Sequence, residues 1–70
     1  MTSVRINGVE RNFPAGEFPA TLGELLGVLN VEPATIVAEV DGKIITRKDF
    51  EQTSIHEGQS IELVRFVGGG

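Results

Sequence analysis

Four leucines with helical spacing constrain the fold of this 70-residue chain more than any other feature. They are Leu22, Leu25, Leu26 and Leu29. Positions i, i+3, i+4 and i+7 share one face of a helix, so the pattern predicts an amphipathic helix over residues 21–30. Thr21 and Glu24 have the spacing of a capping box at its start. Gly23 and Gly27 each cost about 1 kcal/mol relative to alanine inside a helix. The helix therefore depends on packing against a sheet, and we expect the two glycines to allow a close approach to that sheet.

The dipeptide Asn7-Gly8 marks a tight turn near the start of the chain. It suits a type I′ turn because both central positions need a positive φ, and it therefore predicts a β-hairpin over residues 3–13. The register set by this turn places four apolar side chains on one face, namely Val4, Ile6, Val9 and Phe13. Arg11 interrupts that face, and we expect its stem to lie along the edge of the core.

A second turn and a final strand follow the helix. Asp41-Gly42 predicts a hairpin over residues 36–46, residues 47–59 form a connection with a short helical turn, and residues 60–67 form the last strand. One helix among about five strands indicates an α+β domain with the helix on one face of a mixed sheet. With the first and last strands parallel in the middle, this is a ubiquitin-like β-grasp. We assign residues 1–67 to the domain and residues 68–70 to a flexible glycine tail.

Size and charge exclude several classes of function. A chain this short buries only about 60% of the surface that its unfolded form exposes, so we do not expect a deep substrate pocket or a self-contained enzyme. Six basic residues against ten acidic ones give a formal net charge of −4, which opposes binding to nucleic acid. No apolar run reaches the length of about 20 residues that a membrane span needs, and the N-terminus lacks the pattern of a signal peptide. We expect a cytoplasmic protein that is monomeric when free.

Side chains for catalysis or metal binding are scarce. The chain has no cysteine, and His56 is its only histidine. A metal site or a Ser-His-Asp arrangement needs partners that the sequence does not supply, so we interpret His56 as a solvated loop residue. The carboxylates are scattered, and nothing in their spacing favours the acid and base of a glycosidase. We predict neither a metal site nor a bound cofactor.

The last strand carries the first functional signal. Its alternation directs Ile61 and Leu63 toward the helix, and Glu62, Val64 and Phe66 toward the open face of the sheet. An apolar pair on an open face is typical of a docking surface for a partner protein. The alternative is that residues 47–59 cover the pair.

Three glycines at the end of the sequence carry the second signal. Gly68, Gly69 and Gly70 have no side chains and reach about 10 Å when extended, so they fit a narrow channel. A terminal carboxylate has an unperturbed pKa of about 3.3–3.7, so at neutral pH it is an anion and a poor electrophile. Acyl chemistry there requires prior activation, for example as an acyl adenylate formed with ATP. A frayed terminus or a remnant of expression is the alternative.

Four segments together resemble the ThiS-type sulfur carrier proteins of thiamine biosynthesis, which are small relatives of ubiquitin. The segments are residues 4–8 (VRING), 21–26 (TLGELL), 36–42 (IVAEVDG) and 57–70 (EGQSIELVRFVGGG). The last segment is the most specific of the four. In one respect the chain departs from the family, because Asp41-Gly42 stands where the family normally has Asn-Gly, and the same turn accepts both.

The resemblance implies a carrier and not an enzyme. An E1-like adenylyltransferase would use ATP to adenylate the Gly70 carboxylate, which would then become a thiocarboxylate and donate its sulfur to thiazole synthase. Gly69 and Gly70 match the terminal pair of the family, and Gly68 extends their reach. Arg65, Phe66 and Val67 would lie at the mouth of the partner's channel, and with Val64 of the open face they are the expected partner-binding residues. The alternatives are the small subunit of molybdopterin synthase, a ubiquitin-like protein modifier and a plain binding module.

Overall fold

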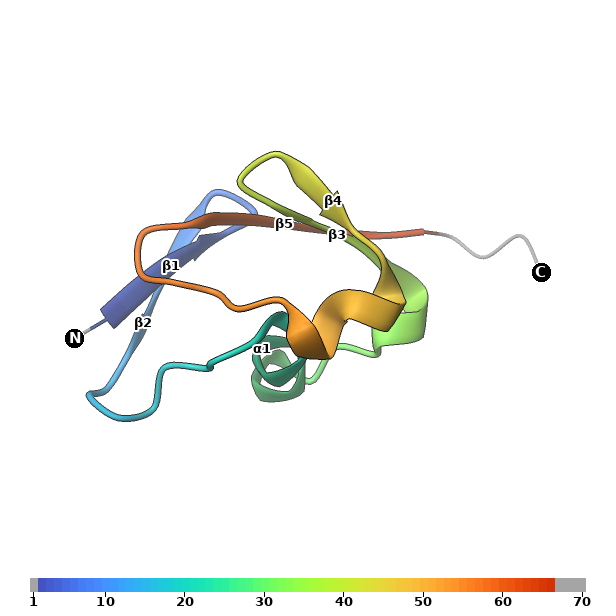
Figure 1. Ribbon diagram of the computed structural model, residues 1–70. Helices are drawn as coiled ribbons and strands as arrows, with labels where there is room; N and C mark the ends of the chain where they lie inside the picture. Colours follow the sequence, from blue (N-terminus) through green and yellow to red (C-terminus); the bar gives the residue numbers. More distant parts are fainter. Residues whose placement is uncertain (1, 67–70) are drawn as a thin grey trace.

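The computed structural model describes residues 2–66, which form a five-stranded mixed sheet with a helix across one face (Figure 1). The strands are β1 (Thr2–Ile6), β2 (Val9–Phe13), β3 (Ile36–Val40), β4 (Lys43–Ile45) and β5 (Ser60–Arg65). Their order is β2-β1-β5-β3-β4, with β1 and β5 parallel and every other neighbouring pair antiparallel. This arrangement confirms the predicted α+β fold of the β-grasp type. The predicted boundary between residues 1–67 and 68–70 lies outside the described residues.

Both predicted hairpin turns are present. Asn7 and Asp41 have φ values of 51° and 50°, and the glycine after each has a φ of 82° or 84°, as a type I′ turn requires. The first turn pairs Ile6 with Val9. Val9 thus lies on the core face by register, yet 60% of it is exposed, because it stands beside the turn on the outermost strand.

The helix α1 (Leu22–Leu29) is one residue shorter at each end than predicted. The backbone N–H of Glu24 donates to Thr21 Oγ1 over 3.1 Å, which satisfies one of the free donors at the helix start. The Glu24 carboxylate reaches back and accepts from the N–H of Ala20 over 3.1 Å, one residue earlier than in a regular capping box. Asn30 ends the helix with a φ of 60°, a left-handed conformation that asparagine tolerates.

The expected role of the two helix glycines is wrong. A Cβ atom at Gly23 would overlap the carboxylate of Glu51, which belongs to the 3₁₀ helix η2 (Arg47–Gln52) and not to the sheet. A Cβ atom at Gly27 would meet nothing within 4 Å. Neither glycine is therefore needed for the approach of α1 to the sheet.

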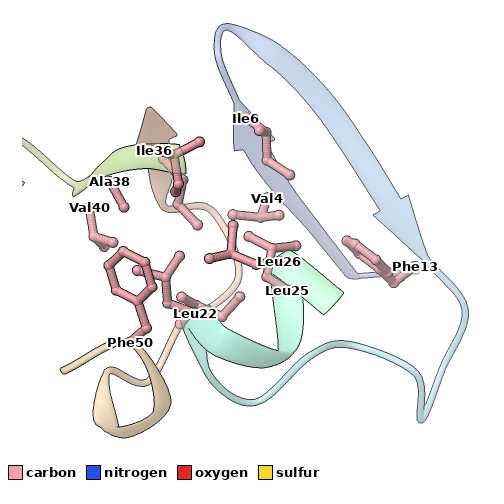
Figure 2. Packing of buried hydrophobic residues seen from close by; sticks show 12 residues of the cluster. Val4, Ile6, Phe13, Leu22, Leu25, Leu26, Ile36, Ala38, Val40 and Phe50 are labelled. Atoms are coloured by element: carbon pink, nitrogen blue, oxygen red, sulfur yellow. The ribbon is translucent and has the colours of Figure 1, made fainter. Parts of the chain in front are cut away.

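The core lies between the sheet and α1 (Figure 2). Three leucines of the helix, Leu22, Leu25 and Leu26, are fully buried. They pack with the inward side chains of the strands, which are Val4, Ile6, Phe13, Ile36, Ala38, Val40 and Ile61. Burying a large apolar side chain stabilises a fold by about 1.5–3 kcal/mol, so this single layer holds the domain together. Arg11 is exposed.

The connection between β4 and β5 completes the core beside the start of α1. It contains η2, whose Phe50 is buried, and Ile55, which is buried as well. Backbone hydrogen bonds from Leu22 N–H to Thr53 and from Ile55 N–H to Ala20 tie the connection to the start of the helix. A further 3₁₀ helix, η1 (Pro33–Thr35), leads into β3 and was not predicted. None of the described helices has the length and apolar character of a membrane span.

Candidate functional site

The open face of the sheet carries four exposed apolar side chains. The connection between β4 and β5 lies on the same side of the sheet as α1 (Figure 1), and its buried residues join the core. It therefore leaves the opposite face uncovered, and the alternative in which residues 47–59 cover Val64 and Phe66 is wrong. Val64 is 58% exposed and Phe66 is 49% exposed. We call the four residues on this face the open-face patch: Val37, Ile44, Val64 and Phe66.

Strand register brings the members of the open-face patch together. Val37 and Val64 are direct partners across β3 and β5, so their side chains point the same way at close range. Phe66 follows two residues after Val64, and its N–H donates to the carbonyl of Thr35 over 3.1 Å. Ile44 enters from β4, where it stands opposite Glu39 of β3. The patch thus spans three strands and borders the point at which the described chain ends.

Two carboxylates also lie on this face, between the apolar residues. Glu39 and Glu62 are direct partners across β3 and β5. Each lies two residues from Val37 or Val64 on its strand, so all four side chains point to the open face. Alternation along the last strand placed Glu62 on this face, but sequence reasoning missed Glu39, its pairing with Glu62, and the contribution of Val37 and Ile44. The alternation within residues 36–46 was the available signal, because it indicates which side chains share a face. It does not indicate which residues of a neighbouring strand lie beside them.

The structure separates Arg65 from Val64 and Phe66. Arg65 is the partner of Ile36, a core residue, so its side chain leaves β5 on the helix side of the sheet, where it is exposed. It does not share a surface with the open-face patch. Val67, the fourth predicted partner-binding residue, lies outside the described residues, as do Gly68, Gly69 and Gly70.

The strand that leads to the glycines is held firmly at its start. The Ser60 N–H donates to Asp41 Oδ1 over 2.9 Å, and Gln59 Nε2 donates to Asp41 Oδ2 over 3.1 Å. Further along, Leu63 N–H donates to Asn7 Oδ1 over 2.7 Å and Asn7 Nδ2 donates to the Leu63 carbonyl over 3.2 Å. The Asn7 amide therefore extends the β1 and β5 ladder after β1 has ended, a role that its turn signal did not predict.

No described feature resembles an enzyme active site. His56 is exposed in a loop, and residues 2–66 contain no group of three His, Cys, Asp or Glu side chains that is arranged to hold a metal ion. An open hollow of about 310 Å³ lies between β4 and the connection that follows it. Two of its polar side chains bond to each other, since Thr46 Oγ1 donates to Asp49 Oδ2 over 2.9 Å.

Comparison with known proteins gives consistent results. A family model described as the ThiS family matches residues 4–70. A thiazole synthase of Paramagnetospirillum magneticum (strain ATCC 700264 / AMB-1) is 37% identical over 65 residues, which are 93% of this chain and 19% of that protein. The chain thus spans about a fifth of the length of this curated relative.

Two solved structures share the fold. The crystal structure of the thiamine biosynthesis protein (ThiS) from Geobacter metallireducens superposes with a TM-score of 0.82 at 28% identity, over 97% of this chain and 99% of that one. The solution structure of a thiamine biosynthesis protein from the same organism gives a TM-score of 0.76 at 29% identity, over 97% and 87% of the two chains.

Proposed function

The chain belongs to the ThiS family, and from this membership we propose that it is a sulfur carrier of thiamine biosynthesis that is loaded at its terminal carboxylate. The observation that carries the proposal is the family match over residues 4–70, because it includes the three glycines as well as the β-grasp body. An E1-like adenylyltransferase is the proposed activating partner, and thiazole synthase is the proposed acceptor of the sulfur.

The proposed loading takes place in two steps at Gly70. A carboxylate oxygen attacks the α-phosphorus of ATP and pyrophosphate leaves, which gives an acyl adenylate. Hydrosulfide supplied by a sulfur donor then attacks the acyl carbon, and AMP leaves with the former carboxylate oxygen, so that sulfur replaces that oxygen without a change of oxidation state. The partner supplies the nucleotide site, and this chain supplies the reacting group. No cysteine is required, because the sulfur is carried on the terminal acyl group.

The architecture supports this role. β5 is the central strand of the sheet, and it is paired with β3 from Ile61 to Arg65 and held by Asn7 on its other side. A strand fixed on both sides is a rigid base for the residues that follow it. The open-face patch includes Val64 of this strand and Phe66 after it, so a partner that docks there lies close to the last described residue.

The relative named thiazole synthase supports the proposed acceptor. It contains a segment 37% identical to this chain as a minor part of its length. Joining two proteins in one chain raises their effective concentration toward each other, which suits a carrier and the enzyme that receives its cargo.

Intact-mass spectrometry tests the proposal. The chain ending at Gly70 is incubated with the adenylyltransferase, ATP and a sulfur donor, and we expect its mass to rise by the difference between one sulfur and one oxygen atom. Omission of ATP and deletion of Gly70 are the controls, and neither should show the rise. An unchanged mass with an enzyme that loads another carrier would contradict the proposal. Protein-linked adducts in its place would identify a conjugating modifier.

A further inference from the structure

The pairing of Glu39 with Glu62 is unfavourable for the fold. Directly opposed residues of an antiparallel pair have Cβ atoms about 4.5–5.5 Å apart, and like charges at that position destabilise a sheet. Glu39 is half-buried and Glu62 is exposed. Both belong to the two strands that meet at the centre of the open face.

The surroundings do not compensate this charge. Ile44 stands opposite Glu39 on β4, and Val64 follows Glu62 on the same face of β5. None of the side-chain hydrogen bonds within residues 2–66 involves either carboxylate. Arg5 is the basic residue whose register brings it toward this face, beside Ser60, but it stands opposite Glu10 on β2.

The other half of the same face is balanced. Arg5 and Glu10 are direct partners across β1 and β2, and Ser3 Oγ donates to Glu10 Oε2 over 3.0 Å. Unbalanced negative charge is thus confined to the β5, β3 and β4 side of the face, which is also the side that carries the open-face patch.

We infer that the open face docks a partner surface that is apolar and presents a basic side chain to Glu39 and Glu62, and that this surface belongs to the adenylating enzyme. The inference rests on the proposed function for the identity of the partner. An arginine suits the site best, because its planar guanidinium can contact two carboxylates at once. Apolar residues around the pair exclude water when the partner docks, which strengthens the charge interaction.

Charge also argues against a second copy of this chain as the occupant. Two open faces brought together would place four glutamates in contact, in a protein whose formal net charge is already −4. Like-charge juxtaposition of this kind selects against a wrong partner. The same glutamates that weaken the sheet therefore keep the patch from associating with itself.

The double variant Glu39→Gln, Glu62→Gln tests the inference. Its affinity for the adenylating enzyme is measured by calorimetry at low and high ionic strength, beside the wild type and a Glu57→Gln control. Glu57 carries the same charge in an exposed loop away from the patch. We expect the double variant to bind at least about 10-fold more weakly than the control and to lose most of the salt dependence. Its melting temperature should equal or exceed that of the wild type, since the repulsion is removed.

The outcomes separate this inference from the proposed function. If the double variant binds as tightly as the Glu57→Gln control while the wild type is loaded with sulfur, the inference is wrong and the function stands. If the wild type binds in a charge-dependent manner but is never loaded, the proposed function fails and the docking surface stands. A wild type that forms a dimer through this face, or that does not bind the enzyme, contradicts the inference.

Discussion

Single residues in this domain serve more than one purpose, and Asn7 is the clearest case. Its backbone adopts the positive φ of a type I′ turn, and its side chain makes two hydrogen bonds with Leu63. The turn was evident from the dipeptide Asn7-Gly8. The contact with β5 was not, because it joins segments far apart in the chain.

The variant Asn7→Gly separates these two roles. Glycine accepts the turn conformation but removes both hydrogen bonds to Leu63, so we expect the free energy of unfolding to fall by about 1–2 kcal/mol. Asn30→Gly is the matched control, because Asn30 also has a positive φ and glycine is favoured at the end of a helix. Chemical denaturation measures both variants. Equal stabilities would show that the Asn7 side chain does not hold β5.

Phe66 tests whether the open-face patch binds a partner. The residue is 49% exposed, so truncation removes little packing, whereas exposed aromatic side chains often dominate interfaces. We expect Phe66→Ala to weaken binding to the adenylating enzyme by about 1 kcal/mol or more with little change in melting temperature. Val28→Ala, a truncation at an exposed helix position, should alter neither quantity. Loss of the fold in Phe66→Ala would assign the residue to the core and would contradict the docking surface.

Among the elements, α1 is the one whose stability depends most on its ends and on its contacts. It has eight residues and contains two glycines, and isolated helices of this length are not stable in water. Its leucine face and its Thr21 cap were both predicted from sequence. Its glycines were misjudged, because the spacing of residues on a helix does not reveal which neighbour each one faces.

Removal of the Thr21 cap should destabilise the domain without affecting its chemistry. Thr21→Ala leaves the N–H of Glu24 without its acceptor, and loss of such a cap costs about 1 kcal/mol. For a domain of this size the melting temperature should fall by about 4–8 °C. Thr21→Ser retains an acceptor oxygen and should melt close to the wild type. Sulfur loading at a temperature where both variants are folded should be unchanged, and a selective loss of loading would place the helix start in the partner interface.

For the whole molecule, the sequence predicted what local signals determine and missed what strand pairing determines. The two hairpins and the helix were predicted because turn dipeptides and periodicity encode them, whereas the parallel pairing of β1 with β5 entered as a premise of the β-grasp architecture. The outward position of Val64 and Phe66 followed from the alternation of one strand. The opposition of Glu39 and Glu62, and the addition of Ile44 to the patch, arise only when β3 lies between β5 and β4.

The central claim is that sulfur is carried on the terminal acyl group of Gly70, and peptide mapping of the loaded protein tests it most directly. Cleavage after Arg65 releases residues 66–70, which contain only phenylalanine, valine and glycine and therefore no sulfur of their own. After incubation with the adenylating enzyme, ATP and a sulfur donor, we predict that this peptide carries one sulfur atom in place of an oxygen, located at Gly70 by fragmentation. A peptide without sulfur, obtained under conditions in which the enzyme loads another carrier, would contradict the account.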